Sequence, residues 1–154
     1  MDRMMIKRVY FDTCAIQRPL DDLSQLRIYL ESEAILAILR LVEDSQVTWI
    51  SSDILMLEIS YITSIEKKMI LQDVLKLAPS QLKRKKSTKL LTEQLMMAES
   101  ITALDAAHVA IALENEIDYF CTSDDKLLKK IKNSAIIKTM QCLSPLELIE
   151  ELTQ

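Results

Sequence analysis

Residues 8–19 read "RVYFDTCAIQRP", and they set the starting point of the fold. Val9, Tyr10 and Phe11 are β-branched or aromatic, so they predict a buried strand. The strand ends at a carboxylate, Asp12, and a charge in that position costs several kcal/mol when it stays dry and unpaired. The fold must therefore provide Asp12 with a partner.

Strands and helices alternate along the rest of the chain. Short apolar segments at 47–51, at 118–123 and within 135–143 predict three further strands. Because apolar strands alternate with helices, we expect an α/β fold with a central parallel sheet that helices cover on both faces. Apolar periodicity, caps and prolines predict helices at 23–43, 54–63, 64–78, 80–99 (one or two helices), 103–115, 124–132 and 145–152.

The composition fits one globular domain over residues 1–154. The chain has 49% hydrophobic residues and is long enough to bury a single core. No apolar run approaches the roughly 18 residues that span a bilayer, and the N-terminus lacks the pattern of a signal peptide, so we expect a cytoplasmic protein that does not bind membranes. Cys14, Cys121 and Cys142 form no CxxC pair, which predicts free, buried thiols.

Glycine is absent from the sequence, although an average usage of about 7% predicts roughly eleven. Its absence excludes the glycine-rich dinucleotide fingerprint, the phosphate-binding loop and the nucleophile elbow of α/β-hydrolases. Any chemistry must therefore be carried out by side chains.

Four carboxylates are placed to meet at one edge of the predicted sheet. Asp12 closes the first strand and Asp124 follows a later one, so both lie at the carboxyl edge, where α/β sheets bind ligands. Asp105 lies in the first turn of a helix, and Glu58 lies nearly two turns into another, from where its longer side chain must reach back. Gathered carboxylates raise each other's pKa unless a cation is present. This favours a Mg²⁺ or Mn²⁺ site that activates a water for phosphodiester hydrolysis, with one or two ions.

Four segments resemble, in the same order, the acidic motifs of the PIN-domain ribonucleases. They are "VYFDTCAI" with Asp12, "SSDILMLEIS" with Glu58, "ALDAAHVAIALE" with Asp105 and "YFCTSDDKLLKK" with Asp124. The segment "CLSPLELIEEL" is similar to the family's last strand and closing helix, so the resemblance spans nearly the whole chain. Among PIN proteins, a chain of this size resembles above all the VapC-type toxins of toxin–antitoxin pairs. The glycines that the family commonly has in its turns are missing here.

The resemblance implies a Rossmann-like sheet and cleavage of single-stranded RNA by an activated water, with Mg²⁺ or Mn²⁺ as cofactor. Thr13 and Thr122 are implied to supply hydroxyls near the site. The doublet Asp124–Asp125 leaves open which carboxylate faces the metal, although the Thr-x-Asp spacing favours the first. A toxin also implies a cognate antitoxin, and apolar surface helices favour a homodimer. The implied metal-site and catalytic carboxylates are Asp12, Glu58, Asp105 and Asp124.

The net charge of −4 disfavours nucleic acid as a partner, but the charge is unevenly distributed. Setting the four proposed ligands aside leaves 19 acidic residues against 19 basic ones. Basic runs then stand out at 83–89 and 126–132, and phosphate contacts of this kind give affinity for RNA without sequence specificity. The residues of the first run that we expect to contact phosphates are Lys83, Arg84, Lys85, Lys86 and Lys89.

Simpler interpretations exist for most of these residues. Asp105 also fits a capping box with Thr102, and Asp124 also fits an ordinary helix cap. His108 lies one turn after Asp105 on the same helical face, yet a lone histidine among apolar residues is more often part of the core. The basic run at 83–89 also fits a solvated helix face. The alternative function is a PIN-like module that binds RNA or protein without cutting it.

Overall fold

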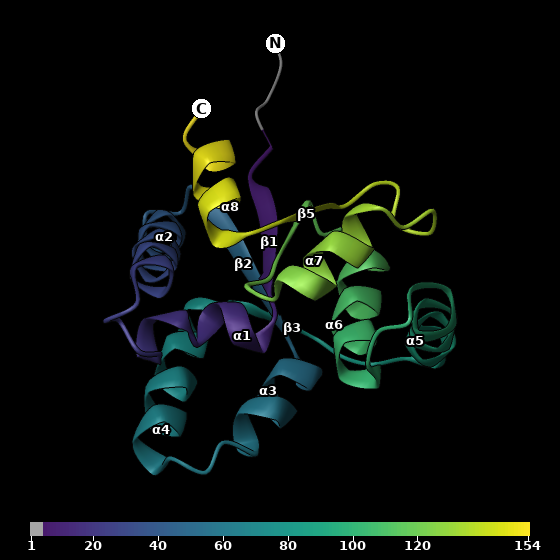
Figure 1. Ribbon diagram of the computed structural model, residues 1–154, viewed down its shortest axis with the longest axis horizontal. Coiled ribbons are helices and arrows are strands. Elements are labelled where there is room, and N and C mark those ends of the chain that lie inside the picture. Colours follow the sequence, from purple (N-terminus) through teal and green to yellow (C-terminus); the bar gives the residue numbers. More distant parts are fainter. Residues whose placement is uncertain (1–4) are drawn as a thin grey trace.

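A computed structural model describes residues 5–154 and contains a five-stranded, all-parallel sheet with the strand order β3-β2-β1-β4-β5 (Figure 1). The central strand β1 pairs with two neighbours, since Val9 lies opposite both Trp49 and Tyr119. The predicted α/β fold with a parallel sheet is therefore confirmed. The strands are β1 (Lys7–Phe11), β2 (Val47–Ser52), β3 (Ser80–Leu82), β4 (Tyr119–Cys121) and β5 (Gln141–Leu143).

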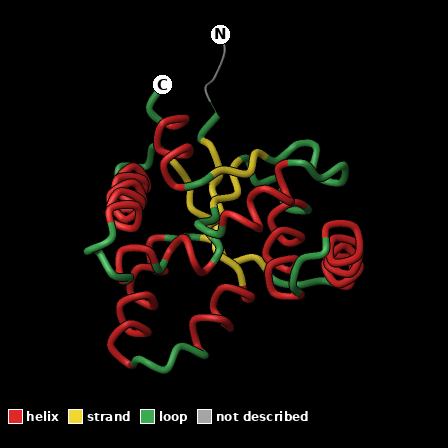
Figure 2. The backbone as a smooth tube through the Cα atoms, viewed as in Figure 1, coloured by secondary structure: helices red, strands yellow, loops and turns green. Residues whose placement is uncertain are grey.

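Helices surround this sheet, and Figure 2 shows them as red coils around the short yellow strands. In Figure 1, α2 and α8 lie on the left and α5, α6 and α7 on the right, while α3 and α4 extend below. Two short 3₁₀ turns, Arg18–Leu20 and Leu75–Leu77, complete the order. The helices are α1 (Thr13–Ile16), α2 (Leu26–Glu43), α3 (Asp53–Ser60), α4 (Ile65–Val74), α5 (Lys86–Glu99), α6 (Ala103–Leu113), α7 (Asp125–Lys132) and α8 (Pro145–Leu152).

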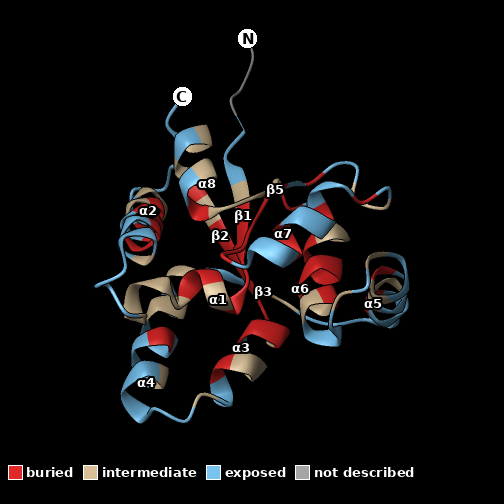
Figure 3. Ribbon diagram, viewed as in Figure 1, coloured by how far each residue is buried: buried red, intermediate tan, exposed pale blue. Residues whose placement is uncertain are grey.

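Strand β1 divides its side chains between two hydrophobic cores, because successive residues of a strand point to opposite faces. Tyr10 belongs to the core that includes Phe120 and residues of α6 and α7. Val9 and Phe11 belong to the other, with Trp49 and residues of α2 and α8. None of these three side chains is exposed, and Figure 3 shows the middle of the sheet in the buried colour. Helices thus cover both faces, as predicted.

The edge strand β3 differs from the sequence prediction. The segment Ser80–Leu82 was expected to begin a helix, but it pairs in parallel with residues 50–52 of β2. Pro79 ends the preceding segment, and most residues that follow, such as Gln81 and Leu82, have a good intrinsic preference for helix. A neighbouring strand with free backbone groups outweighs such a preference, because pairing in a sheet depends on context. The next helix, α5, therefore begins at Lys86.

Tight helix ends form without glycine. Ser45, Ser100 and Glu116 have positive φ angles of 58°, 55° and 58°, just beyond the ends of α2, α5 and α6. Glycine usually occupies this left-handed position, and another residue costs roughly 1–2 kcal/mol there. The chain accepts this cost in three turns, so the missing glycines do not alter the topology.

Two smaller expectations concern thiols and membranes. Cys121 and Cys142 are free and buried, as predicted, whereas Cys14 is partly exposed at the start of α1. Across residues 5–154, none of the helices combines the length and the apolar character that crossing a membrane requires.

Candidate functional site

Asp12 lies at the carboxyl end of β1, where it caps helix α1. Its Oδ1 accepts the backbone N–H of Ala15 at 3.0 Å and the thiol of Cys14 at 3.2 Å. Its own N–H donates to the carbonyl of Cys121 at 3.1 Å, which ties the residue to β4. Only 3% of Asp12 is exposed. The strand and the cap together hold this carboxylate buried at the carboxyl edge of the sheet.

Burial makes the charge of Asp12 costly. It raises the pKa of the carboxyl from 3.8 to about 6, although hydrogen bonds from the Thr122 hydroxyl, the Ala15 N–H and the Cys14 thiol oppose the shift. No basic side chain is among the groups that hydrogen-bond this carboxyl. Asp12 is therefore a buried anion whose neighbours only partly satisfy it, and a bound cation would relieve that cost.

Glu58 reaches back from the second turn of α3, as its position in the sequence required. Its Oε1 accepts a hydrogen bond from the Thr13 hydroxyl and lies 2.7 Å from Nε2 of His108. Burial by itself raises the pKa of Glu58, but the bonds from His108 and Thr13 outweigh it and hold the pKa below its usual value. Glu58 is thus an ionised carboxylate held from two other elements.

His108 is buried, with 1% exposed, as a core histidine should be. It also reaches the candidate site, because its two ring nitrogens contact different side chains. Nδ1 lies 2.6 Å from the Tyr10 hydroxyl, which in turn lies 2.6 Å from Oγ of Ser52. The spacing from Asp105 was the one sequence signal for His108. Tyr10 resembled an ordinary core residue and Ser52 an ordinary helix cap, so no sequence pattern singled out either one.

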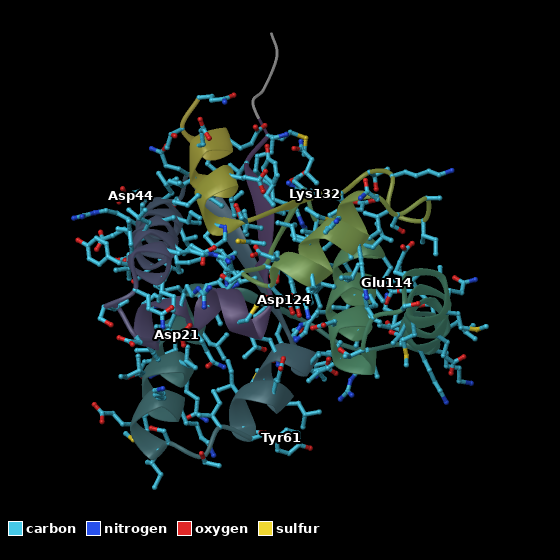
Figure 4. All side chains as sticks on the ribbon, in the orientation of Figure 1. Asp21, Asp44, Tyr61, Glu114, Asp124 and Lys132 are labelled. Atoms are coloured by element: carbon cyan, nitrogen blue, oxygen red, sulfur yellow. The ribbon has the colours of Figure 1, made fainter. Side chains whose placement is uncertain are left out.

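Asp105 and Asp124 lie at the N-terminal ends of two helices. The Thr102 hydroxyl caps α6 by accepting the N–H of Asp105 at 3.2 Å. Asp124 caps α7, since its Oδ1 accepts the N–H groups of Lys126 and Leu127 at 3.0 and 3.1 Å. The cap by Asp124 is therefore present, as is the Thr102 half of the predicted capping box, and the two aspartates also line one hollow of about 180 Å³. Figure 4 labels Asp124 near the centre of the view.

The electrostatic setting of Asp105 links it to other carboxylates. Its side chain is partly buried, and burial is the main reason why its pKa is raised. The negative charges of Asp124 and Glu58 raise it further, while a hydrogen bond with Thr102 opposes the shift. Asp105 therefore lies near enough to both carboxylates to be repelled by them, which is the condition that a cation relieves.

The second aspartate of the doublet has a different role. Asp125 pairs with both terminal nitrogens of Arg27, at 2.6 and 2.7 Å, and Arg27 also donates to the carbonyl of Ser123. The guanidinium lies within 3.4 Å of Glu31 as well, a buried carboxylate on α2. Because Asp125 is bound to Arg27 and Asp124 lies beside Asp105, the first member of the doublet is the better candidate ligand.

The hydroxyls of Thr13 and Thr122 each bond residues of the candidate site. Thr13 donates to Glu58, and Thr122 accepts the N–H of Asp124 at 3.1 Å while it also bonds Asp12. Thr122 therefore connects the carboxylate that ends β1 with the backbone of Asp124, which follows β4. Its hydroxyl lies 3.4 Å from the Cys14 sulfur, so α1 packs against the same place.

The donor chemistry fits a hard divalent cation, because carboxylate and hydroxyl oxygens are the ligands that Mg²⁺ and Mn²⁺ prefer. Burial raises the pKa of both Asp12 and Asp105, and the groups around each carboxyl oppose that shift only in part. Within residues 5–154, however, no three His, Cys, Asp or Glu side chains are grouped closely enough to hold a metal ion. The ligand types therefore suit the ion. In this structure, one carboxylate oxygen of Glu58 and one of Asp124 accept hydrogen bonds from other groups of the protein.

The basic run lies beside the N-terminal end of α6. Arg84, Lys85 and Lys89 line a groove of about 550 Å³ together with Ala103 and other residues of α5 and α6. Arg84 also donates from Nε to Asp53 at the start of α3, at 3.1 Å. Arg84 therefore already has an acidic partner. The side chains predicted to contact phosphates are all exposed, and they are Lys83, Arg84, Lys85, Lys86 and Lys89.

A scan against protein-family models finds no match, and a search of curated proteins finds no similar sequence. Solved structures do match. The FitAB complex bound to a DNA fragment gives a TM-score of 0.57 at 18% identity, over 89% of this chain and 94% of that one. VapBC2 from Rickettsia felis, bound to a DNA fragment from its promoter, gives a TM-score of 0.55 at 13% identity. The match covers 89% of this chain and 98% of that one.

A third structure, PAE2754 from Pyrobaculum aerophilum, gives a TM-score of 0.54 at 12% identity and covers 97% of this chain and 98% of that one. Likeness at such low identity concerns the arrangement of the chain and not its chemistry. With its sheet order 3-2-1-4-5 and flanking helices, the protein has a PIN-like α/β fold.

Proposed function

We propose that the protein is a metal-dependent endoribonuclease that cleaves single-stranded RNA, and that it is the toxin of a toxin–antitoxin pair. The observation that carries this proposal is the buried Asp12 at the carboxyl edge of a PIN-like sheet, with its pKa raised to about 6. A carboxylate that served only as a cap would lie at the surface, where its charge costs little. An uncompensated buried charge at a ligand-binding edge is typical of a functional site.

Four carboxylates are the proposed ligands of one or two Mg²⁺ or Mn²⁺ ions. Bound there, the ion supplies an activated water and neutralises charge on the phosphodiester. Thr13 orients the carboxylate of Glu58 through its hydroxyl, and Thr122 supports Asp12. Backbone N–H groups at the first turn of α7 fix Oδ1 of Asp124. The proposed ligands are Asp12, Glu58, Asp105 and Asp124.

The proposed substrate is RNA, held through its phosphates by the exposed lysines of residues 83–89. Of these, Lys85 and Lys89 line the groove between α5 and α6, and α6 also carries Asp105. Contacts of this kind are independent of sequence, so target choice must come from other features. An RNA substrate would place the protein in the cytoplasm, as one folded domain that acts without a membrane.

The proposed partners are a cognate antitoxin and a second copy of the chain. FitAB and VapBC2, two structures of similar fold, are DNA-bound complexes, and by analogy we assign this chain an antitoxin. Large apolar side chains are exposed on α4 and next to it: Tyr61 is 72% exposed, Ile65 74% and Met69 60%. Apolar groups left exposed in this number favour a protein interface.

The test is cleavage of a mixed pool of single-stranded RNAs by the purified protein with Mn²⁺ or Mg²⁺. We expect cleavage that a chelator stops and that Asp12→Asn abolishes while the variant keeps its circular dichroism spectrum. Asp44→Asn is the matched control, because this exposed residue follows α2 away from the site. If the wild type leaves every RNA intact with either ion and Asp12→Asn binds RNA equally well, the chain is a non-cutting RNA-binding module.

A further inference from the structure

A chain of short hydrogen bonds runs from the start of α3 through the sheet to Glu58. Oγ of Ser52 and the hydroxyl oxygen of Tyr10 are 2.6 Å apart, and the same Tyr10 oxygen is 2.6 Å from Nδ1 of His108. Nε2 of His108 then lies 2.7 Å from Oε1 of Glu58. Ser52 and Tyr10 are fully buried, so water does not contribute to this chain.

The first bond has one permitted direction. Oγ of Ser52 already accepts the N–H of Leu55 at 3.0 Å, as the cap of α3. Its own hydrogen needs an acceptor, and Tyr10 is the remaining side-chain or backbone group bonded to this oxygen among the described residues. Buried hydroxyl groups are nearly always paired. Ser52 therefore donates to Tyr10.

The second bond follows from the first. The Tyr10 oxygen accepts from Ser52 and carries a single hydrogen, which it can give only to Nδ1 of His108. Burial raises the pKa of Tyr10, so the phenol keeps that hydrogen. Nδ1 is consequently an acceptor, and the ring hydrogen lies on Nε2, where it donates to Glu58. The reverse order would leave the Ser52 hydrogen without an acceptor in a dry site.

Both donors to Glu58 meet the same oxygen. His108 and Thr13 each bond Oε1, and among the hydrogen bonds of residues 5–154 none ends on Oε2. The carboxylate is therefore held by one oxygen while the other remains uncommitted. A third group from outside the chain can bind Oε2 without displacing either donor.

We propose that Ser52 and Tyr10 are positioning residues that fix His108 in its Nε2–H tautomer, and that His108 thereby holds Glu58 with Oε2 free to bind a ligand. The tautomer rests on the hydrogen bonds alone. Only the identity of the ligand on Oε2, a divalent cation, rests on the proposed function. Partners that orient a ligand through a second hydrogen bond typically affect metal affinity or activity by about 10–100-fold when they are removed.

Nuclear magnetic resonance of the imidazole nitrogens tests the tautomer directly. His108 is the one histidine of the chain, so its side-chain signals need no assignment. In metal-free protein at neutral pH we expect Nε2 to be protonated and Nδ1 unprotonated. A wild-type spectrum with a protonated Nδ1, alone or together with Nε2, overturns the proposal even if no variant folds.

Tyr10→Phe removes the donor to Nδ1, and we expect it to give a mixture of both tautomers. Tyr119→Phe is the matched control, because that hydroxyl makes one 3.5 Å contact with Glu151, and its spectrum should equal the wild type's. An unchanged tautomer in folded Tyr10→Phe overturns the assigned role.

Calorimetry with Mn²⁺ tests the consequence for Glu58. We expect Tyr10→Phe and His108→Ala to weaken binding about 10–100-fold, with partial rescue in His108→Gln, whose amide can still donate to Glu58. Equal binding by Tyr10→Phe and Tyr119→Phe overturns the positioning role. If the wild type has the expected tautomer but cuts no RNA, the proposed function fails while the tautomer stands. If it cuts RNA with a protonated Nδ1, the present inference fails alone.

Discussion

The candidate site has two halves that the protein holds in different ways. We call Asp12, Thr13, Glu58 and His108 the closed half, and Asp105 and Asp124 the open half. In the closed half, each carboxylate is bonded to side chains and rests against buried strands or helices. In the open half, each aspartate lies in the first turn or at the cap of its own helix, and burial together with repulsion from Asp124 raises the pKa of Asp105.

This difference shows that packing prepares one half of the site while the other half depends on local caps. The closed half joins side chains that are 45 to 95 residues apart in the chain, so it forms only when the sheet is complete. Helix caps form locally and persist at partial exposure. We therefore expect a bound cation to move mainly the carboxylates of the open half, toward those of the closed half.

The largest expected effect separates the two roles of Asp12. Asp12→Asn should abolish RNA cleavage and yet stabilise the metal-free protein at pH 7 by about 2 kcal/mol, because it removes a costly buried charge while asparagine keeps the helix cap. Urea unfolding and a cleavage assay measure both quantities. A variant less stable than the wild type would mean that the closed half fully compensates the charge of Asp12.

The aspartate doublet sharpens the distinction between halves. Asp124→Asn should lower cleavage about 100-fold with little change in stability, since asparagine also caps a helix. Asp125→Asn serves as the matched control, because that side chain is 68% exposed and pairs with Arg27. Its effect on stability should stay below about 1 kcal/mol, as for other exposed ion pairs. Equal cleavage loss in both variants would remove the reason to prefer Asp124.

The pH dependence of stability tests the closed half alone. The pKa of Asp12 in the folded protein, about 6, lies above its ordinary value of 3.8, so the native state binds the extra proton. The contribution of Asp12 to the free energy of unfolding should therefore be most favourable below about pH 4. It should fall by about 3 kcal/mol as the pH rises through about 6. The measured quantity is the difference between wild type and Asp12→Asn in metal-free buffer, which should grow through that window. Added Mn²⁺ should reduce it.

The smallest expected effect concerns the basic run beside the open half. Lys85→Ala should weaken the binding of all RNA sequences alike. It should also reduce the slope of log affinity against log salt concentration by the amount expected for about one phosphate contact. Arg84→Ala should change RNA affinity less, because Arg84 is already paired with Asp53. Fluorescence anisotropy at several salt concentrations measures both. A change confined to one RNA sequence would indicate contacts with bases instead.

Much of the fold could be predicted because its signals are local. The apolar segment Val9–Phe11 indicated the central strand, and the caps Thr102 and Ser144 indicated the starts of α6 and α8. Strand β3 could not be predicted in this way. Its three residues are mostly exposed and take their conformation from pairing with β2.

The sequence by itself determined which carboxylates end strands and begin helices, because capping and apolar periodicity act within about four residues. Tertiary structure alone decided that His108 meets both Tyr10 and Glu58, 98 and 50 residues away. It also decided that Arg27 pairs with Asp125, across another 98 residues. Such pairs depend on strand order and on how each helix packs against the sheet. Those properties emerge only when the whole chain has folded, so no local pattern carries them.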